Sequence, residues 1–142
     1  MSDRHLWDLL GATHRGVLAT IKRDGRPQLS VVDYLFDPAR RVLATSVTAG
    51  RAKVANLRRD PRASLHAGAP DLGAYAVAEG LADFSAVARE PGDEAVAELV
   101  QLYRDIRGEH PDWAEYRAAM IADRRMVLRI TVDRVYGLAT PG

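Results

Sequence analysis

The chain has 142 residues, of which 47% are hydrophobic and 27% charged, and its net charge is +1. This composition predicts one soluble domain over residues 1–142, and the near-neutral charge excludes a general attraction to nucleic acid or acidic lipid. There is no cysteine, which excludes disulfides and thiolate chemistry and agrees with a cytoplasmic location. The charged N-terminus and the lack of an apolar run of ~20 residues predict neither a signal peptide nor a membrane helix.

The first half of the chain is predicted to consist mainly of strands joined by tight turns. β-Branched and apolar residues dominate its segments, and Asp24-Gly25 is typical of a two-residue hairpin turn because glycine tolerates a positive φ. Pro61 limits the helix that follows, since the residue before a proline avoids the helical region. The expected elements are a helix over 5–12, strands over 16–22, 28–36 and 41–47, and a helix over 52–59.

In the second half, two helices are predicted between four strands. The first helix begins at Pro91 and stops at Gly108, and Asp112 with Glu115 resembles a capping box for the next. Strands are expected over 62–67, 75–85, 126–132 and 134–138. Because the helices do not alternate regularly with the strands, this pattern predicts an antiparallel barrel of the α+β class and not a doubly wound parallel sheet.

Segment 46–56 combines the end of a strand, a glycine and two cations at the start of a helix. The N–H groups of a helix N-terminus are unpaired and carry partial positive charge, so Arg51 and Lys53 lie in an unfavourable position. A bound anion would accept these N–H groups and pair with both side chains, and Gly50 would allow close approach of the backbone. The pattern indicates a phosphate site, with a solvated basic face on a short helix as the alternative.

Other chemistries have less support in the sequence. Arg58, Arg59 and Arg62 extend the basic patch, but no aromatic residue interleaves with them, so nucleic-acid binding is not expected. The four histidines lack a metal-ligand spacing, so no metal site is expected. No nucleophile motif is present, and Ser30 and Ser46 are interpreted as hydrogen-bonding groups on strands.

Nine short segments, spread from about residue 10 to residue 138, are informative through their common order and spacing. They are Gly16-Val-Leu-Ala-Thr-Ile, Gly25-Arg-Pro-Gln-Leu-Ser30, Arg51-Ala-Lys53, Asn56-Leu-Arg-Arg-Asp-Pro-Arg-Ala-Ser64, Tyr75-Ala-Val-Ala-Glu-Gly80, Tyr103-Arg104, Gly108-Glu-His-Pro-Asp-Trp113, Asp123-Arg124-Arg125 and Val135-Tyr-Gly-Leu138. Together they resemble the split-barrel flavin and deazaflavin oxidoreductases related to pyridoxamine 5'-phosphate oxidase, above all the actinobacterial branch that uses coenzyme F420. The resemblance implies an antiparallel split β-barrel of Greek-key type with flanking helices.

The same resemblance implies a homodimer whose two cofactor sites lie in grooves between the subunits. Arg51 and Lys53 then correspond to the pair that holds the cofactor phosphate, with Ala52 between them and Asn56 behind them. The other implied cofactor-binding residues are Gln28, Ser30 and Val31 along the ring system, Ser46 and Val47 beside the phosphate, Gly50 at the turn, and Tyr75 along the groove. Some relatives have an aromatic residue near Gly73, and this difference affects the substrate side of the pocket.

The implied activity is hydride transfer from reduced coenzyme F420 to a conjugated small molecule, such as a quinone, an enone or a tetrapyrrole like biliverdin. An FMN enzyme of the pyridoxamine-phosphate-oxidase type and a cofactor carrier without its own substrate remain alternatives, because FMN presents a phosphate to the same pair. The sequence identifies no proton donor. Val32, Tyr34 and Phe36 are expected to form an apolar strand face that a partner subunit covers.

Overall fold

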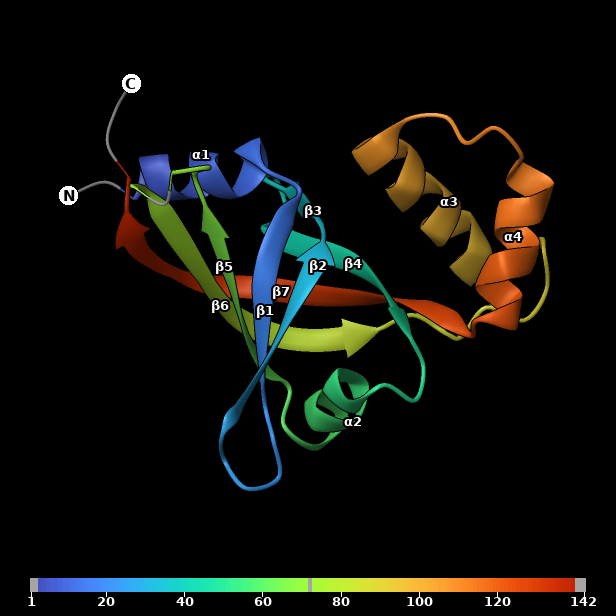
Figure 1. The fold of residues 1–142 in the computed structure, drawn as a ribbon, viewed down its shortest axis with the longest axis horizontal. Coiled ribbons are helices and arrows are strands. Elements are labelled where there is room, and N and C mark those ends of the chain that lie inside the picture. Colours follow the sequence, from blue (N-terminus) through green and yellow to red (C-terminus); the bar gives the residue numbers. More distant parts are fainter. Residues whose placement is uncertain (1–2, 72, 140–142) are drawn as a thin grey trace.

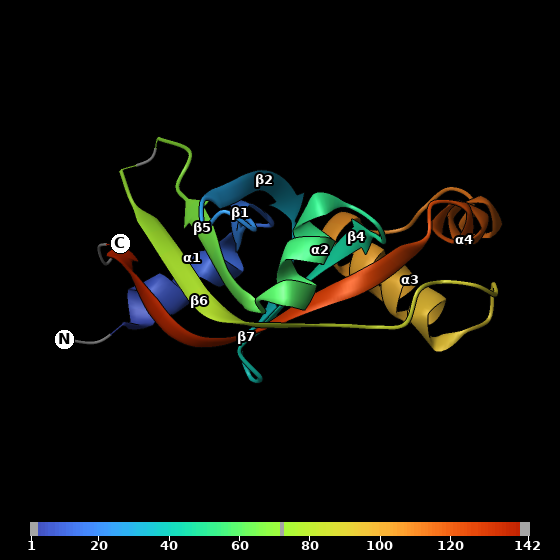
Figure 2. The same cartoon turned by 90° about the horizontal axis from the view of Figure 1, so that it is seen from below.

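The computed structural model describes residues 3–71 and 73–139. Seven antiparallel strands, in the order β2-β1-β5-β6-β7-β4-β3, form a sheet that curls into a half-barrel (Figures 1 and 2). The strands are β1 (Arg15–Ile21), β2 (Pro27–Asp33), β3 (Leu35–Asp37), β4 (Val42–Thr48), β5 (Arg62–Gly68), β6 (Tyr75–Phe84) and β7 (Arg125–Leu138). The helices are α1 (Arg4–Ala12), α2 (Ala52–Arg59), α3 (Glu94–Arg107) and α4 (Trp113–Ala122). The predicted α+β class with an antiparallel split barrel is confirmed.

The curl of the sheet depends on a break at Tyr34. The sequence predicts one strand over 28–36, but the structure has two: β2 pairs with β1, and β3 pairs with β4 at the other end of the strand order. Tyr34 joins them, with its N–H donating to the His14 carbonyl at 2.7 Å and its hydroxyl to the Leu10 carbonyl at 2.7 Å. These two hydrogen bonds hold the chain where it crosses from one sheet edge to the other.

Two hydrophobic clusters lie on opposite sides of β7. Met126 and Leu128 are fully buried in the cluster inside the half-barrel, whereas Val127 is fully buried under α3 and α4. This alternation follows from the strand period of two. In Figure 1, α3 and α4 lie at one end of the sheet and α1 at the other. Among the described residues, no helix is long and apolar enough to cross a membrane.

One turn and one helix boundary differ from the sequence prediction. The β1–β2 loop has three residues instead of two, because Lys22 pairs with Arg26 and Gly25 takes a φ of 88°. Helix α3 begins after Pro91, since the Asp93 side chain accepts the Val96 N–H at 2.8 Å and thereby caps the helix.

At the C-terminal end, β7 is one strand where two were predicted. Its register with β6 shifts between Glu79 and Gly80, which pair with Arg134 and Val132, so Asp133 is the extra residue of a bulge. A Cβ at Gly80 would collide with the carbonyl of Thr131, so glycine permits this close approach. The predicted interruption at residue 133 is therefore a bulge that leaves the strand continuous.

The apolar face expected to need a partner is buried within the chain itself. Val32, Tyr34 and Phe36 are only 5%, 0% and 7% exposed, because they point into the half-barrel. The opposite face of β2 is the open one: Leu29 is 63% exposed and Val31 is 66% exposed. The prediction named the wrong face of the strand, since alternation alone does not say which face is inside.

Candidate functional site

Three cations surround a pocket of about 390 Å³ between β2, the end of β4 and the start of α2, which we call the cation pocket. Its lining residues are Gln28, Ser30, Ser46, Val47, Thr48, Arg51, Ala52, Lys53 and Arg125. None of these carries a carboxylate. Arg51 is the N-cap of α2, no side chain caps the helix, and its first turn has no acidic residue. The first backbone N–H groups of the helix therefore add to the positive charge of the pocket.

Lys53 is destabilised in its charged form by this environment. Partial burial, followed by repulsion from Arg125 and Arg51, lowers the pKa of the Lys53 ammonium group. Its ammonium group donates to the Ser30 hydroxyl oxygen, at 3.5 Å from Nζ. An anion in the cation pocket would stabilise the charged lysine, because it would pair with the ammonium group and offset the repulsion from Arg125 and Arg51.

Arg125 is the third cation of the pocket, and it was not among the predicted site residues. The pairing of β4 with β7 places it opposite Thr48, and its Nη1 lies 3.5 Å from the Ser46 hydroxyl. Asp123 fixes its orientation through a 2.6 Å contact between Oδ2 and Nε. The one available signal was the Asp123-Arg124-Arg125 segment, whose distance in sequence from Arg51 gave no reason to join the two.

Seven of the eleven predicted cofactor-binding residues line the cation pocket together. They are Gln28, Ser30, Ser46, Val47, Arg51, Ala52 and Lys53. Gly50 precedes α2 with a φ of 90°, and nothing lies within 4 Å of a Cβ built there. Its use in this chain is therefore the turn itself, because a side chain at that φ would be strained.

Asn56 and Tyr75 are placed outside the pocket wall. Asn56 is buried behind it, and its Nδ2 donates to Gln28 Oε1 at 2.8 Å and to Thr20 Oγ1 at 3.1 Å, so it orients the Gln28 amide. Tyr75 pairs with Leu138 at the far end of β6 and stacks on His66. Within one chain the structure does not bring Tyr75 to the cation pocket.

A second pocket of about 370 Å³ continues from the first, between the sheet and the α3–α4 hairpin, and we call it the helical pocket. It shares Ser46, Lys53 and Arg125 with the cation pocket. The rest of its wall is largely apolar: Val31, Val32, Leu99, Leu102, Ile106 and Met120, together with the aromatic Tyr103 and Tyr116. Val31 is thus the one predicted ring-contacting residue that faces this second space.

Charged side chains at the rim of the helical pocket tie α3 to β2. Asp33 lies between Arg15, whose Nε is 2.9 Å from Oδ1, and Arg107, which pairs with Oδ2. Burial pushes the pKa of the Asp33 carboxyl upward, but hydrogen bonds from both arginines outweigh it and leave the pKa below its ordinary value. The carboxylate therefore stays charged and holds the helix end against the strand.

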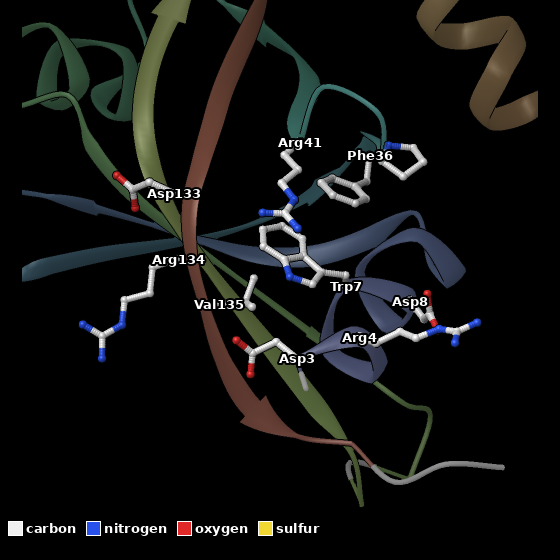
Figure 3. A pocket seen from close by; sticks show the side chains of 10 residues that line it. Asp3, Arg4, Trp7, Asp8, Phe36, Arg41, Asp133, Arg134 and Val135 are labelled. Atoms are coloured by element: carbon white, nitrogen blue, oxygen red, sulfur yellow. The ribbon is translucent and has the colours of Figure 1, made fainter. Parts of the chain in front are cut away.

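A larger pocket, about 780 Å³, lies at the other end of the sheet beneath α1, and we call it the tryptophan pocket (Figure 3). Trp7 stacks on Phe36 at 5.8 Å, and the Arg41 guanidinium carbon lies 4.1 Å from the Trp7 ring centroid. Its wall holds three aspartates and three arginines: Asp3, Asp8, Asp133, Arg4, Arg41 and Arg134. None of the predicted site residues lines it.

The described residues contain no group of three or more histidine, aspartate or glutamate side chains placed to hold a metal ion. The charged side chains that line the two connected pockets are Arg51, Lys53, Arg107, Arg125 and Asp33.

The chain matches the pyridoxamine 5'-phosphate oxidase family over residues 3–139. It belongs to this family. A conserved hypothetical protein from Mycobacterium tuberculosis has a similar structure, with a TM-score of 0.73 and 24% identity over 98% of this chain and 85% of that one. An F420 reductase gives a TM-score of 0.69 and 24% identity over 91% of this chain and 94% of that one. A heme binding protein from Mycobacterium smegmatis gives 0.68 and 25%, over 97% of this chain and 54% of that one.

Proposed function

We propose that this family member is an oxidoreductase that uses coenzyme F420 to reduce a conjugated small molecule. The observation that carries the proposal is the cation pocket, where Arg51, Lys53 and Arg125 meet an uncapped helix N-terminus without a carboxylate in the wall. Such a pocket is suited to a phosphate group. Membership of a family with flavin-using oxidoreductases and the similarity to an F420 reductase support the choice of cofactor.

The residues present divide the work of binding such a cofactor. Arg51, Lys53 and Arg125 would hold the phosphate, while Ser30 and the amide of Gln28 offer hydrogen bonds along β2. The apolar wall of the adjoining helical pocket would exclude water from the reacting ring. When bound, the reduced deazaflavin supplies a hydride to the acceptor, and the protein contributes binding and orientation.

Alanine substitutions at Arg51 and Lys53 test the phosphate site. Each substitution is expected to weaken binding of coenzyme F420 by about 1–3 kcal/mol, the range for a hydrogen bond to a charged group. Calorimetric titration of the purified protein measures this directly. Arg23→Ala, in the exposed β1–β2 loop, is the matched control and should bind as the unaltered chain does. Unchanged affinity in the double variant would place the cofactor elsewhere.

FMN is the main alternative cofactor, since it also carries a phosphate. Parallel titrations with FMN and coenzyme F420 compare the two dissociation constants, and much tighter binding of FMN would overturn the assignment of coenzyme F420 as the cofactor. If the protein is a cofactor carrier without its own substrate, it should bind the cofactor but should not oxidise the reduced cofactor with any acceptor of a broad panel.

Heme is a further candidate because of the heme-binding neighbour. Among the described residues that line the cation and helical pockets there is no histidine to ligate the iron. Hemin added to the protein is therefore not expected to give the shifted Soret band of a histidine-ligated heme, and such a band would favour heme over the deazaflavin.

A homodimer through the open face of β2 is part of the proposal. Leu29 and Val31 lie two residues apart on the same exposed face of β2, and Val31 also lines the helical pocket. A partner chain would cover them and close the cofactor groove. Light scattering at micromolar concentration is expected to give the dimer mass, and a monomer would contradict the shared groove.

A further inference from the structure

We propose that the helical pocket binds the hydride acceptor and selects a planar conjugated carbonyl compound of two or three fused rings with an acidic substituent. This inference rests on the proposed function, because it assigns the second substrate of the same site. Its basis is the continuity of the two pockets: Ser46, Lys53 and Arg125 belong to both walls. A molecule in the helical pocket therefore lies next to whatever the cation pocket holds.

The size and wall of the pocket define the class of ligand. At about 370 Å³ it lies near the lower end of the ~300–1,000 Å³ range of small-molecule sites. The apolar side chains of Leu99, Leu102, Ile106 and Met120 form one wall from α3 and α4, and Val31 contributes from β2. This space suits a quinone of two or three fused rings, whereas a linear tetrapyrrole with its four rings and two propionates would extend beyond it.

Tyr103 supplies the hydrogen bond that would orient such a ligand. Its ring is held by His110, Trp113 and Tyr116, with centroids 5.3, 5.7 and 5.0 Å away. The neighbouring Tyr116 hydroxyl donates to the Leu99 carbonyl at 3.1 Å, whereas the Tyr103 hydroxyl has no hydrogen-bond partner in the described part of the chain. A fixed ring with a free hydroxyl in a pocket wall is a donor ready for a carbonyl oxygen of the acceptor.

Arg107 accounts for the preference for an acidic substituent. It lines the helical pocket, and its ion pair with Asp33 uses Nη2, which leaves Nη1 and Nε as further donors. Asp33 is the one carboxylate in the wall, and it is already shared by Arg15 and Arg107. With Lys53 and Arg125 also present, the pocket is positive, and a sulfonate or carboxylate on the ring would be attracted to it.

The test is calorimetric titration of the cofactor-free and the F420-loaded protein with anthraquinone-2-sulfonate. Tyr103→Phe is expected to raise the dissociation constant about three- to tenfold, the effect of one lost hydrogen bond, without changing affinity for coenzyme F420. Tyr136→Phe is the matched control, since Tyr136 is exposed on β7 and lines neither pocket. Equal affinity of Tyr103→Phe and unaltered protein would overturn the role of Tyr103.

Tryptophan fluorescence provides an independent location of the quinone. In a Trp7→Phe variant, Trp113 is the remaining tryptophan, and its ring lies 5.7 Å from that of Tyr103. Saturable quenching with the calorimetric dissociation constant is expected in this variant. If the quinone binds without quenching Trp113, the acceptor site is elsewhere and the inference fails.

The acidic substituent is tested by comparing two ligands in one variant. Arg107→Gln is expected to reduce the preference for anthraquinone-2-sulfonate over the neutral 2-(hydroxymethyl)anthraquinone about three- to tenfold. The ratio cancels any loosening of α3, because both ligands experience it. An unchanged ratio would overturn the charge preference. Failure of coenzyme F420 to bind the unaltered protein would instead contradict the proposed function, while the quinone titrations of the cofactor-free protein would still report on this pocket.

Discussion

The cation pocket and the tryptophan pocket, at opposite ends of the sheet, differ in the charge balance of their walls. The tryptophan pocket is the larger, about 780 Å³ against 390 Å³, yet its wall holds three arginines and three aspartates. The cation pocket has three cations and no carboxylate in its wall, and the nearby Asp123 pairs with Arg125 from outside that wall. Unbalanced charge, and not volume, therefore distinguishes the candidate anion site.

The two pockets also use their arginines in different ways. In the tryptophan pocket, the Arg41 guanidinium lies over the Trp7 ring, which in turn stacks on Phe36, so it contributes to packing between α1, β3 and the turn before β4. In the cation pocket, Arg51 begins a helix and Arg125 is oriented by Asp123, so both leave donors toward an open space. The first pocket is expected to govern stability and the second to govern binding.

The largest expected effect is the loss of stability on replacement of Trp7, which belongs to the pocket expected to govern stability and not binding. Trp7→Ala removes the middle of the stack between Phe36 and Arg41 and should lower the free energy of unfolding by roughly 2–4 kcal/mol, somewhat less than for a fully buried tryptophan. Urea denaturation followed by circular dichroism measures this loss. Affinity for coenzyme F420 should stay the same under folding conditions, and a parallel loss of affinity would erase the distinction between the pockets.

Replacement of Arg125 tests the same comparison through cofactor affinity. Arg125→Ala should weaken coenzyme F420 binding by about 1–3 kcal/mol, although the sequence did not mark this residue as part of the site. Arg41→Ala is the matched control at the tryptophan pocket and should leave the dissociation constant unchanged. If the two variants behaved alike in titration calorimetry, charge balance would not be the feature that selects the anion site.

The smallest expected effect is that of Lys53 on the free energy of unfolding of the cofactor-free protein. Because the pKa of folded Lys53 is lowered, the unfolded chain binds its proton more tightly, and the charged lysine destabilises the fold at neutral pH. Lys53→Met should therefore raise the free energy of unfolding, by less than about 1 kcal/mol because the group is partly exposed. The difference should shrink as pH rises through the lowered pKa toward the ordinary value for lysine.

The same shift predicts how phosphate binding depends on pH. Lys53 loses its proton at a lower pH than a free lysine, so affinity for the phosphate group should begin to fall at a pH below the ordinary lysine value. Titrations from neutral to alkaline pH measure the decline, which Lys53→Met should flatten. A decline of equal steepness in the variant would assign it to another group.

Most elements with strong local signals could be predicted from the sequence. The bounds of α2 agree with the predicted residues 52–59, and Gly108 ends α3 with a φ of 87° as its position indicated. Asp112 caps α4 by accepting the Glu115 N–H at 3.1 Å. Such features depend on neighbours within one turn of chain, so a few residues contain all the information required.

Errors arose where a distant segment decided the local structure. The break at Tyr34 depends on His14 and Leu10, which are far away in sequence. No residue pattern within 28–36 predicts it. The error over the buried face of β2 has the same cause. The alternation of residues defines two faces, and only packing against distant segments decides which face is inside.

The sequence by itself determined that two cations begin a helix without any acidic neighbour, since helix-end electrostatics depend on local spacing. The tertiary structure alone decided that Arg125 joins them, because β4 and β7 pair across the sheet and bring it beside Ser46. It also decided that the α3–α4 hairpin forms the wall of a second, connected pocket containing Tyr103. Pairing and packing between distant segments are long-range interactions, and a single sequence does not display them.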